Sequence, residues 1–257
     1  MDSQTGDPRI ALVTGANKGI GREIGRQLAG LGMTVLLGAR DKDRRERAAA
    51  ELRAEGLLTV HPIALDVTDA GTVAAAAADI DIRFGRLDVL VNNAAVTGAG
   101  RVAPGESARS QRPSTADPAV VRSVFDTNVF GVLTVTNAML PLLLRSDAPR
   151  VVNMSSSVGS FAAMTDRDGP LAGLPASAAY VPSKSTLNAM TVQYAKEFRG
   201  TKLLINAACP GYVATDLNNH TGVRTVEQGA AIAVRLATLG PDGPSGGFFD
   251  DDGPVPW

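Results

Sequence analysis

Short apolar runs that alternate with helix-like segments restrict the fold of this 257-residue chain more than any other feature. The runs predicted as strands are Ile10–Val13, Thr34–Leu37, Thr59–Leu65, Val89–Val91, Val151–Met154 and Leu203–Ala207. Most are continuously apolar, as strands buried on both faces of a parallel sheet are. Parallel strands need right-handed helical crossovers. We therefore predict an α/β fold, a doubly wound parallel sheet of about seven strands flanked by helices, with the apolar Gly246–Phe249 as the last strand.

Helix signals fill the intervals between these runs. Helices are expected to begin near Gly21, Arg44, Ala70, Pro118, Ala179 and Val226. Asp69 and Thr225 precede two of them and are typical N-cap residues. A chain of this length is compatible with one α/β domain, so we expect residues 1–257 to form a single domain.

Charge and composition exclude several classes of function. The 25 basic residues balance 26 acidic ones, and only 4% of residues are aromatic, so nucleic-acid binding is not expected. No apolar run is judged to reach the roughly 20 residues that cross a bilayer, and residues 1–9 lack the pattern of a signal peptide. A soluble, cytoplasmic protein is expected. With one cysteine, Cys209, and two histidines, a metal site is not expected.

Two stretches interrupt the strand and helix pattern, residues 98–117 and 159–177, and both are rich in Gly with Pro, Ser or Ala. They follow the fourth and fifth predicted strands, at the carboxyl edge of the sheet, where α/β proteins bind ligands. We interpret them as walls of a substrate site; mobile surface insertions without a role are the alternative.

A glycine-rich loop follows the first strand directly, as Thr14-Gly-Ala-Asn-Lys-Gly-Ile-Gly21. Glycines at a strand-to-helix turn let the backbone approach a pyrophosphate, whose charge is favoured by the free N–H groups of the helix. The position of the motif predicts a dinucleotide site. Its candidate cofactor-binding residues are Gly15, Asn17, Lys18, Gly19, Ile20 and Gly21.

This loop resembles the cofactor loop of the classical short-chain dehydrogenase/reductase family, whose motifs follow in order along almost the whole chain. The resemblance implies a Rossmann fold. Asp66, with Val67 beside it, resembles the family's adenine-contacting acidic position. Asn93 lies in Asn92–Ala95, which resembles the family's N-N-A-G segment with Ala95 in place of the usual Gly. As structural alternatives, Asp66 would cap a helix or turn and Asn93 would link strands.

The end of the second strand bears on the choice of cofactor. NAD-binding sites place a carboxylate there, whereas a 2′-phosphate needs cations. This chain has Ala39 and Arg40, and Lys18 is expected to approach the same phosphate, so we predict NADP(H). Arg40 as a solvated surface charge is the alternative, and Asp41 is interpreted as an N-cap.

A phenol and an ammonium stand four residues apart at Tyr180 and Lys184, on one helix face. We expect the nearby cation to lower the pKa of the phenol, which suits Tyr180 for acid–base chemistry. An exposed helix surface is the alternative. The family pattern of Asn, Ser, Tyr and Lys implies that both are catalytic and that both also bind the cofactor.

The same pattern points to Ser156 and Asn128. Ser156 follows the fifth strand and is expected to donate a hydrogen bond to the substrate oxygen, whereas Ser155 and Ser157 are expected to cap the strand end or bond locally. Asn128 resembles the asparagine that holds a water in the family's proton relay; an internal helix amide is the alternative.

After the sixth strand, Cys209–Asp216 resembles the family's P-G segment near the nicotinamide. The resemblance implies cofactor contacts from Pro210, Gly211, Val213 and Thr215. Cys209 is expected to be buried and inert. The acidic run Asp250–Asp252 is interpreted as a solvated turn.

These features predict an NADPH-dependent reductase of ketones or aldehydes, resembling the carbonyl-reductase-like subgroup. Its partner is a small-molecule carbonyl or alcohol, with no nucleic acid and no membrane. A secondary-alcohol dehydrogenase and a non-catalytic NADP sensor are the alternatives. The long interval before Tyr180 leaves open a monomer or a homo-oligomer, and the short interval after Thr215 predicts a reduced lid and an open, permissive pocket.

Overall fold

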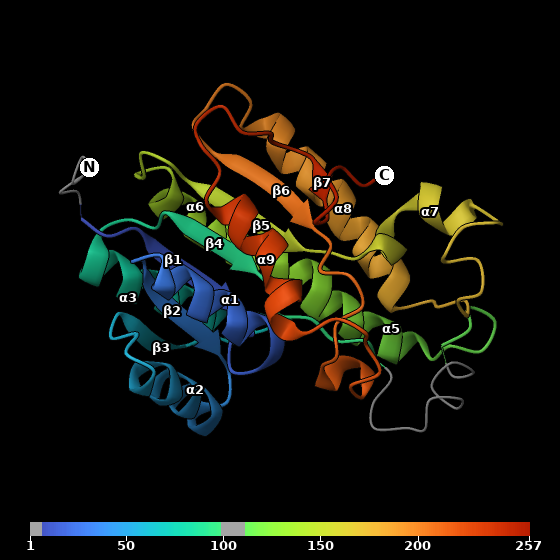
Figure 1. The fold of residues 1–257 in the computed structure, drawn as a ribbon, viewed down its shortest axis with the longest axis horizontal. Coiled ribbons are helices and arrows are strands. Elements are labelled where there is room, and N and C mark those ends of the chain that lie inside the picture. The colour runs from blue at the N-terminus through green and yellow to red at the C-terminus, as the bar shows by residue number, and fades with distance from the viewer. Residues whose placement is uncertain (1–6, 99–110) are drawn as a thin grey trace.

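Seven strands form one all-parallel sheet in residues 7–98 and 111–257, which the computed structural model describes. The strands are β1 (Ile10–Thr14), β2 (Thr34–Ala39), β3 (Val60–Ala64), β4 (Val89–Asn92), β5 (Arg150–Met154), β6 (Leu204–Ala208) and β7 (Phe248–Phe249). Their spatial order is β3-β2-β1-β4-β5-β6-β7. Each predicted strand is present to within one or two residues, and the short apolar β7 completes the sheet (Figure 1).

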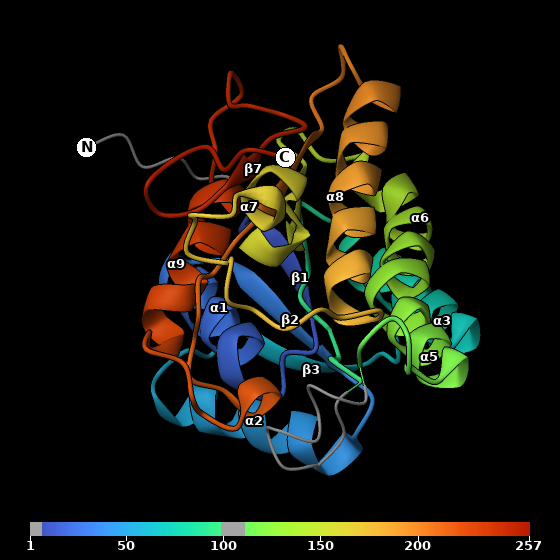
Figure 2. The ribbon, with the colours of Figure 1, turned by 90° about the vertical axis from the view of Figure 1, so that its right-hand side faces the viewer.

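Helices cover both faces of the sheet (Figure 2). In the described residues they are α1 (Gly19–Gly30), α2 (Lys42–Ala54), α3 (Ala70–Phe84), α5 (Pro118–Phe125), α6 (Gly131–Leu143), α7 (Phe161–Thr165), α8 (Tyr180–Glu197) and α9 (Val226–Ala237). In Figure 2, α1, α2 and α9 lie on one side of the strands, with α3, α5, α6 and α8 on the other. This is the predicted doubly wound arrangement. The Asp69 and Thr225 side chains accept the N-terminal N–H groups of α3 and α9, as expected of caps.

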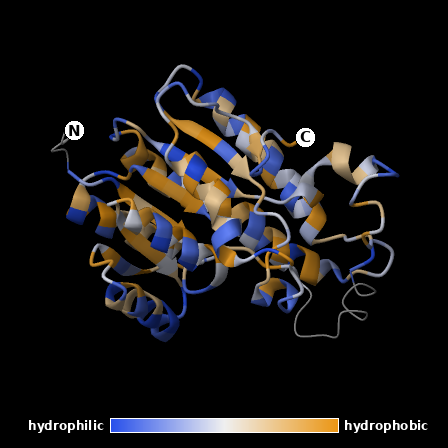
Figure 3. Cartoon of the chain, viewed as in Figure 1, coloured by the Kyte–Doolittle hydropathy of each residue, from blue (hydrophilic) through white to orange (hydrophobic). Residues whose placement is uncertain are grey.

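The core consists of two apolar layers separated by the sheet. One lies between the sheet and α1, α2 and α9, and the other between the sheet and α3, α6 and α8. Every residue of β1, β2, β4, β5 and β6 is buried. The strands are mostly hydrophobic, whereas the outer face of α2 is polar (Figure 3).

The parallel register brings the carboxyl ends of the strands to one edge. Thr14 pairs with Gly38, Asn92 with Asn153, and Met154 with Ala208. The segments that follow β1, β2, β4, β5 and β6 therefore start from the same side of the molecule, although they are far apart in sequence. The glycine loop, Asn93, Ser156 and Pro210 all belong to these segments.

One apolar helical run requires a correction to the sequence-based view that nothing here reaches membrane-spanning length. Residues Pro118–Leu143, comprising α5, the π-helical η1 (Asp126–Phe130) and α6, are long and apolar enough to cross a membrane by length and composition alone. In this fold α6 packs against α3 and β4, and it buries Val135, Met139 and Leu143. Packing of the buried face of α6 against α3 and β4 accounts for part of this composition.

The two predicted insertions meet at the carboxyl edge. Residues 99–110 of the first lie outside the described part of the chain. From residue 111 onward, Gln111 accepts a hydrogen bond from the N–H of Ala178 (2.8 Å) on its carbonyl oxygen and one from Ser177 Oγ (3.1 Å) on its side chain. The second insertion is not wholly a loop, because it contains α7, whose Ala162 N–H donates to the carbonyl of Trp257.

Candidate active site

A cleft of about 860 Å³ opens beside the glycine loop at the carboxyl edge of the sheet. Eleven of the predicted cofactor-binding residues line it: Gly15, Asn17, Lys18, Gly19, Ile20, Gly21, Arg40, Asp66, Val67, Asn93 and Thr215. They come from the segments after β1, β2, β3, β4 and β6. The parallel register therefore assembles residues that are up to 200 positions apart, from Gly15 to Thr215, around one cavity.

The glycine loop needs its glycines for close packing. Gly15 has a φ of +63°, which favours glycine. A Cβ on Gly21 would lie 2.3 Å from Asn93 Nδ2, so only glycine fits there. Asn93 Nδ2 donates to the carbonyls of Thr14 (2.9 Å) and Gly15 (3.3 Å), and thereby holds the loop against β4. The start of α1 faces the cleft without a side-chain cap, as a pyrophosphate site requires.

The far end of the cleft carries both charge signs. Asp41 caps α2 through the N–H of Arg44 (3.0 Å), as predicted. Arg44 itself also lines the cleft, a position the sequence analysis missed although it is one helical turn after Arg40. Burial would raise the pKa of Asp66, but hydrogen bonds from Thr68 and the charge of Arg40 outweigh it and lower that pKa. Asp66 also accepts the N–H of Thr68, so it forms the turn that its structural alternative described.

Lys18 departs from its expected orientation. Its Nζ lies 2.5 Å from Asp216 Oδ2, so it does not converge with Arg40, whose charge acts on Asp66. Asp216, Leu217 and His220 form the opposite wall of the cleft, in the turn after Thr215. The sequence analysis missed these residues, although Asp216 and His220 stand four residues apart directly after the predicted contact Thr215.

The predicted chemical groups lie together at the ends of β5 and α8. Tyr180 begins α8, and its ring centre lies 5.5 Å from Lys184 Nζ, so the two side chains share one helix face as predicted. A side-chain hydrogen bond joins Ser156 to Tyr180. Lys184 is buried and donates to the carbonyl of Met154, the last residue of β5, over 2.7 Å. These residues do not line the 860 Å³ cleft itself.

The pKa values in this site differ from the expectation that Lys184 would lower that of Tyr180. Burial raises the pKa of Tyr180 to about 12, with the nearby Cys209 adding to the effect and the bond to Ser156 opposing it. Burial also lowers the pKa of Lys184 to about 8. Desolvation disfavours the charged form of each group, and it is the largest cause of both shifts.

The three serines after β5 have hydrogen-bond partners that differ in part from those predicted. Ser155 is buried, and its Oγ donates to Asn188 Oδ1 on α8 (2.5 Å) rather than bonding locally. The N–H of Ser157 donates to Cys209 Sγ (3.2 Å), and Cys209 is buried as expected. Ser156 accepts the N–H of Val158 (3.4 Å) and is the only one of the three whose hydroxyl also pairs with Tyr180 in the described structure.

Asn128 is buried in η1, and its side chain makes three hydrogen bonds. Its Oδ1 accepts the N–H of Val96 (2.9 Å), and its Nδ2 donates to the carbonyl of Val96 (2.9 Å) and to Ser183 Oγ (3.0 Å). Ser183 in turn donates to the carbonyl of Tyr180 (2.6 Å). The side chain of Asn128 therefore ties the segment after β4 to the first turn of α8.

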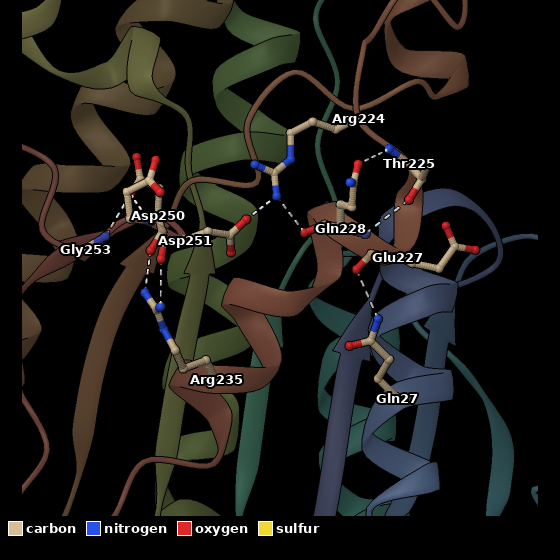
Figure 4. A network of polar contacts seen from close by, with 10 residues as sticks. Gln27, Arg224, Thr225, Glu227, Gln228, Arg235, Asp250, Asp251 and Gly253 are labelled. Atoms are coloured by element: carbon tan, nitrogen blue, oxygen red, sulfur yellow. Dashed lines mark hydrogen bonds and ion pairs between the residues drawn. The ribbon is translucent and has the colours of Figure 1, made fainter.

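The segment after β6 is held by a polar network that joins Arg224 to the end of the chain (Figure 4). Arg224 donates to the carbonyl of Gln228 (3.0 Å) and pairs with Asp251. Arg235 donates to the carbonyls of Asp250 and Asp251. The acidic run is an exposed turn, as interpreted, and Arg224 and Arg235 fasten it to α9.

Arg224 also contacts the P-G segment. Its Cδ lies 2.6 Å from where a Cβ on Gly211 would be, and Gly211 has a φ of +73°. Val213 is buried and bridges to Arg224 in the backbone. Pro210, Gly211 and Val213 do not line the cleft, nor do Tyr180 and Lys184. Of the four cofactor contacts predicted in this segment, Thr215 alone reaches the cleft.

Comparison with known proteins agrees with this geometry. Residues 9–224 match the family model described as short chain dehydrogenase. The chain belongs to the short chain dehydrogenase family. It is 38% identical to short-chain dehydrogenase/reductase 1 of Saponaria officinalis, over 94% of this chain and 93% of that one. It is 33% identical to carbonyl reductase (NADPH) 1 of Sus scrofa, over 100% and 96%.

Solved structures of the short chain dehydrogenase family share the fold. Salutaridine reductase from Papaver somniferum superposes with a TM-score of 0.78 at 33% identity, covering 95% of this chain and 99% of that one. A short chain dehydrogenase from Shigella flexneri, complexed with NADP, gives 0.78 at 28% identity, over 94% and 96%. The protein is thus an oxidoreductase of a family whose members use a nicotinamide cofactor, and the glycine cradle, the uncapped start of α1 and the arginines that line the cleft fit such a group.

Proposed function

We propose that the protein reduces a ketone or aldehyde to an alcohol with NADPH, using Tyr180, Ser156, Lys184 and Asn128. The observation that carries this proposal is the grouping of Ser156, Tyr180 and the buried Lys184 at the ends of β5 and α8, with Lys184 Nζ 5.5 Å from the ring centre of Tyr180. The names of similar proteins support it, because they include a carbonyl reductase (NADPH), salutaridine reductase and (−)-isopiperitenone reductase.

The proton chemistry follows from the state of Tyr180. A phenol whose pKa is raised to about 12 stays protonated at neutral pH, as an acid that protonates a developing alkoxide must be. A bound nicotinamide would supply the hydride. Ser156 donates its hydroxyl hydrogen to the substrate oxygen and so stabilises the charge that develops there.

Lys184 and Asn128 support the acid. Lys184 keeps a positive charge near the ring of Tyr180, which stabilises the phenolate left after proton transfer. Asn128 positions Tyr180 through Ser183, whose hydroxyl bonds the Tyr180 carbonyl. For the cofactor, Gly15, Gly19 and Gly21 would hold the pyrophosphate, and Arg40 and Arg44 would supply cations for the 2′-phosphate. Lys18 would join them on leaving Asp216.

The same residues also catalyse the reverse reaction, which is the second candidate. Two relatives named (+)-neomenthol dehydrogenase, from Arabidopsis thaliana and Capsicum annuum, favour a secondary alcohol as a substrate. Either direction uses Tyr180, as acid in reduction and as base in oxidation.

The test is the loss of reduced-nicotinamide absorbance with a panel of aldehydes, ketones, diketones and quinones, with NADPH and NADH compared. We expect turnover with NADPH that exceeds turnover with NADH. Tyr180→Phe should lower it by about 10²–10⁴-fold, while NADPH binding, followed by fluorescence, is kept. Full activity of the variant would overturn the assignment of the acid, and cofactor binding without turnover in either direction would favour a sensor.

A further inference from the structure

Two segments far apart in sequence face each other across the cleft at the glycine loop. Lys18 and Gly19 lie on one side, and Thr215, Asp216 and His220 lie on the other. The approach is close, because a Cβ on Gly19 would lie 3.6 Å from Thr215 Cγ2. A ligand along the glycine loop therefore meets the charges of the turn formed by residues 215–221.

Asp216 uses both carboxylate oxygens in this turn. Oδ2 lies 2.5 Å from Lys18 Nζ, and Oδ1 lies 2.8 Å from His220 Nε2. The hydrogen bonds of Lys18 and His220 lower the pKa of Asp216, so the carboxylate is charged at neutral pH. The Lys18 and Asp216 side chains are 55% and 54% exposed, so either is free to exchange partners with a solvent-borne ligand.

The turn does not depend on Lys18 for its shape. Asn218 Nδ2 donates to the carbonyl of Val213 (2.9 Å), and Asn218 Oδ1 accepts the N–H of Thr215 (3.2 Å). Thr221 Oγ1 donates to the carbonyl of Asn218 (2.7 Å). These bonds anchor the turn to the buried Val213. Loss of the Asp216 charge therefore alters what Lys18 contacts rather than how the turn folds.

Lys18 is suited to exchange between acidic partners. Its ammonium is a compact charge on a flexible stem, unlike the planar guanidinium groups of Arg40 and Arg44 in the same cleft. The charge of Arg40 acts on Asp66, and Asp41 pairs with Arg44 at 3.5 Å. Lys18, Arg40 and Arg44 thus each have a carboxylate neighbour. The neighbour of Lys18 is Asp216, which lies on the opposite wall of the cleft.

We infer that Asp216 is a specificity-determining residue that competes with the 2′-phosphate of the cofactor for Lys18 and so weakens the preference for NADP(H) over NAD(H). The inference rests on the proposed use of NADP(H). It assigns a function to a carboxylate that would otherwise oppose binding of a phosphate. Asp216 lowers the affinity for the 2′-phosphorylated cofactor. When that cofactor binds, Lys18 leaves Asp216, and the carboxylate keeps only its contact with His220.

Calorimetric titration with two adenine nucleotides tests this without catalysis. Adenosine 2′,5′-bisphosphate carries the distinguishing phosphate, and adenosine 5′-monophosphate lacks it. Exposed ion pairs are worth up to about 1 kcal/mol, so Asp216→Asn should raise the affinity ratio of the two ligands about two- to five-fold. Glu227→Gln removes a charge from the same cleft and should leave the ratio near that of the wild type.

A second variant removes the shared cation. Lys18→Met should lower the affinity for the bisphosphate relative to the monophosphate. In that background Asp216→Asn should no longer change this affinity ratio, because the ammonium for which Asp216 and the phosphate compete is gone. An unchanged or lower ratio in Asp216→Asn alone, or an equal rise in Glu227→Gln, overturns the competition. A wild-type protein that does not favour the bisphosphate overturns the proposed NADP(H) preference instead. Thermal unfolding confirms that each variant is folded.

Discussion

Lys184 Nζ on α8 donates a 2.7 Å hydrogen bond to the carbonyl oxygen of Met154 at the end of β5. The bond joins the helix that carries Tyr180 to the strand that leads into Ser156, and the ammonium that makes it is buried. The position of the two hydroxyl groups therefore depends on a charged group that the protein has removed from water.

The burial of Lys184 predicts a pH-dependent stability. Its pKa falls from 10.5 to about 8 on folding, so between these values the unfolded chain binds more protons than the folded one. The free energy of unfolding should therefore rise with pH through that window, and below it the buried charge costs on the order of 3 kcal/mol. The free energy of unfolding of Lys184→Met should exceed that of the wild type by most at neutral pH. The difference should shrink as the pH approaches 10.5.

Urea unfolding of both proteins across this pH range measures the difference. Lys196→Met, at an exposed position of the same helix, controls for the loss of a lysine. A difference between Lys184→Met and the wild type that stays constant with pH would contradict the prediction.

Neighbouring serines should respond in opposite ways. Ser155→Ala leaves the buried Asn188 without its 2.5 Å partner and should cost about 1–3 kcal/mol of stability, with turnover largely kept. Ser156→Ala should preserve stability and lower the rate constant by about 10²–10³-fold, because the lost donor serves the transition state. Unfolding midpoints measure the stability of both variants, and initial rates measure their turnover. The reverse pattern would show that the two roles have been exchanged.

Two glycines of α1 form a matched pair. Gly21→Ala places a methyl group 2.3 Å from Asn93 Nδ2, and such overpacking should cost about 1–3 kcal/mol and displace the amide that holds the glycine loop. Gly30→Ala meets nothing within 4 Å and should raise stability by about 0.4–1 kcal/mol. Chemical denaturation and NADPH titration report on both. Equal effects at the two sites would refute the packing argument.

The Arg224–Asp251 contact should be energetically coupled. Arg224→Ala should cost about 1–3 kcal/mol, because a charged hydrogen-bonding group joins three chain segments, and a double-mutant cycle with Asp251→Asn should give a coupling above about 0.5 kcal/mol. The Lys202–Asp147 pair, with side chains 68% and 101% exposed, is the control and should couple more weakly, because solvent screens it. A smaller coupling for Arg224 than for Lys202 would show that the network contributes little.

Much of the architecture and of the cofactor cleft was predictable because the signals are local. Continuous apolar runs place the strands, and Asp69 and Thr225 mark helix starts through bonds to residues two or three positions away. The turn at Thr14–Gly21 needs glycine wherever the backbone approaches Asn93. Parallel pairing then brings the strand ends to one edge, so the cleft follows from the order of elements.

The partners of charged and polar side chains were decided only in the folded molecule. Lys18 bonds a residue 198 positions away, and Ser155 bonds Asn188 instead of its own backbone. The pKa of Tyr180 rises because burial disfavours the phenolate, an effect that depends on the atoms packed around the ring. Local periodicity therefore determined the sheet, its helices and the phosphate loop of this protein, whereas long-range packing determined which charges meet and how strongly each holds its proton.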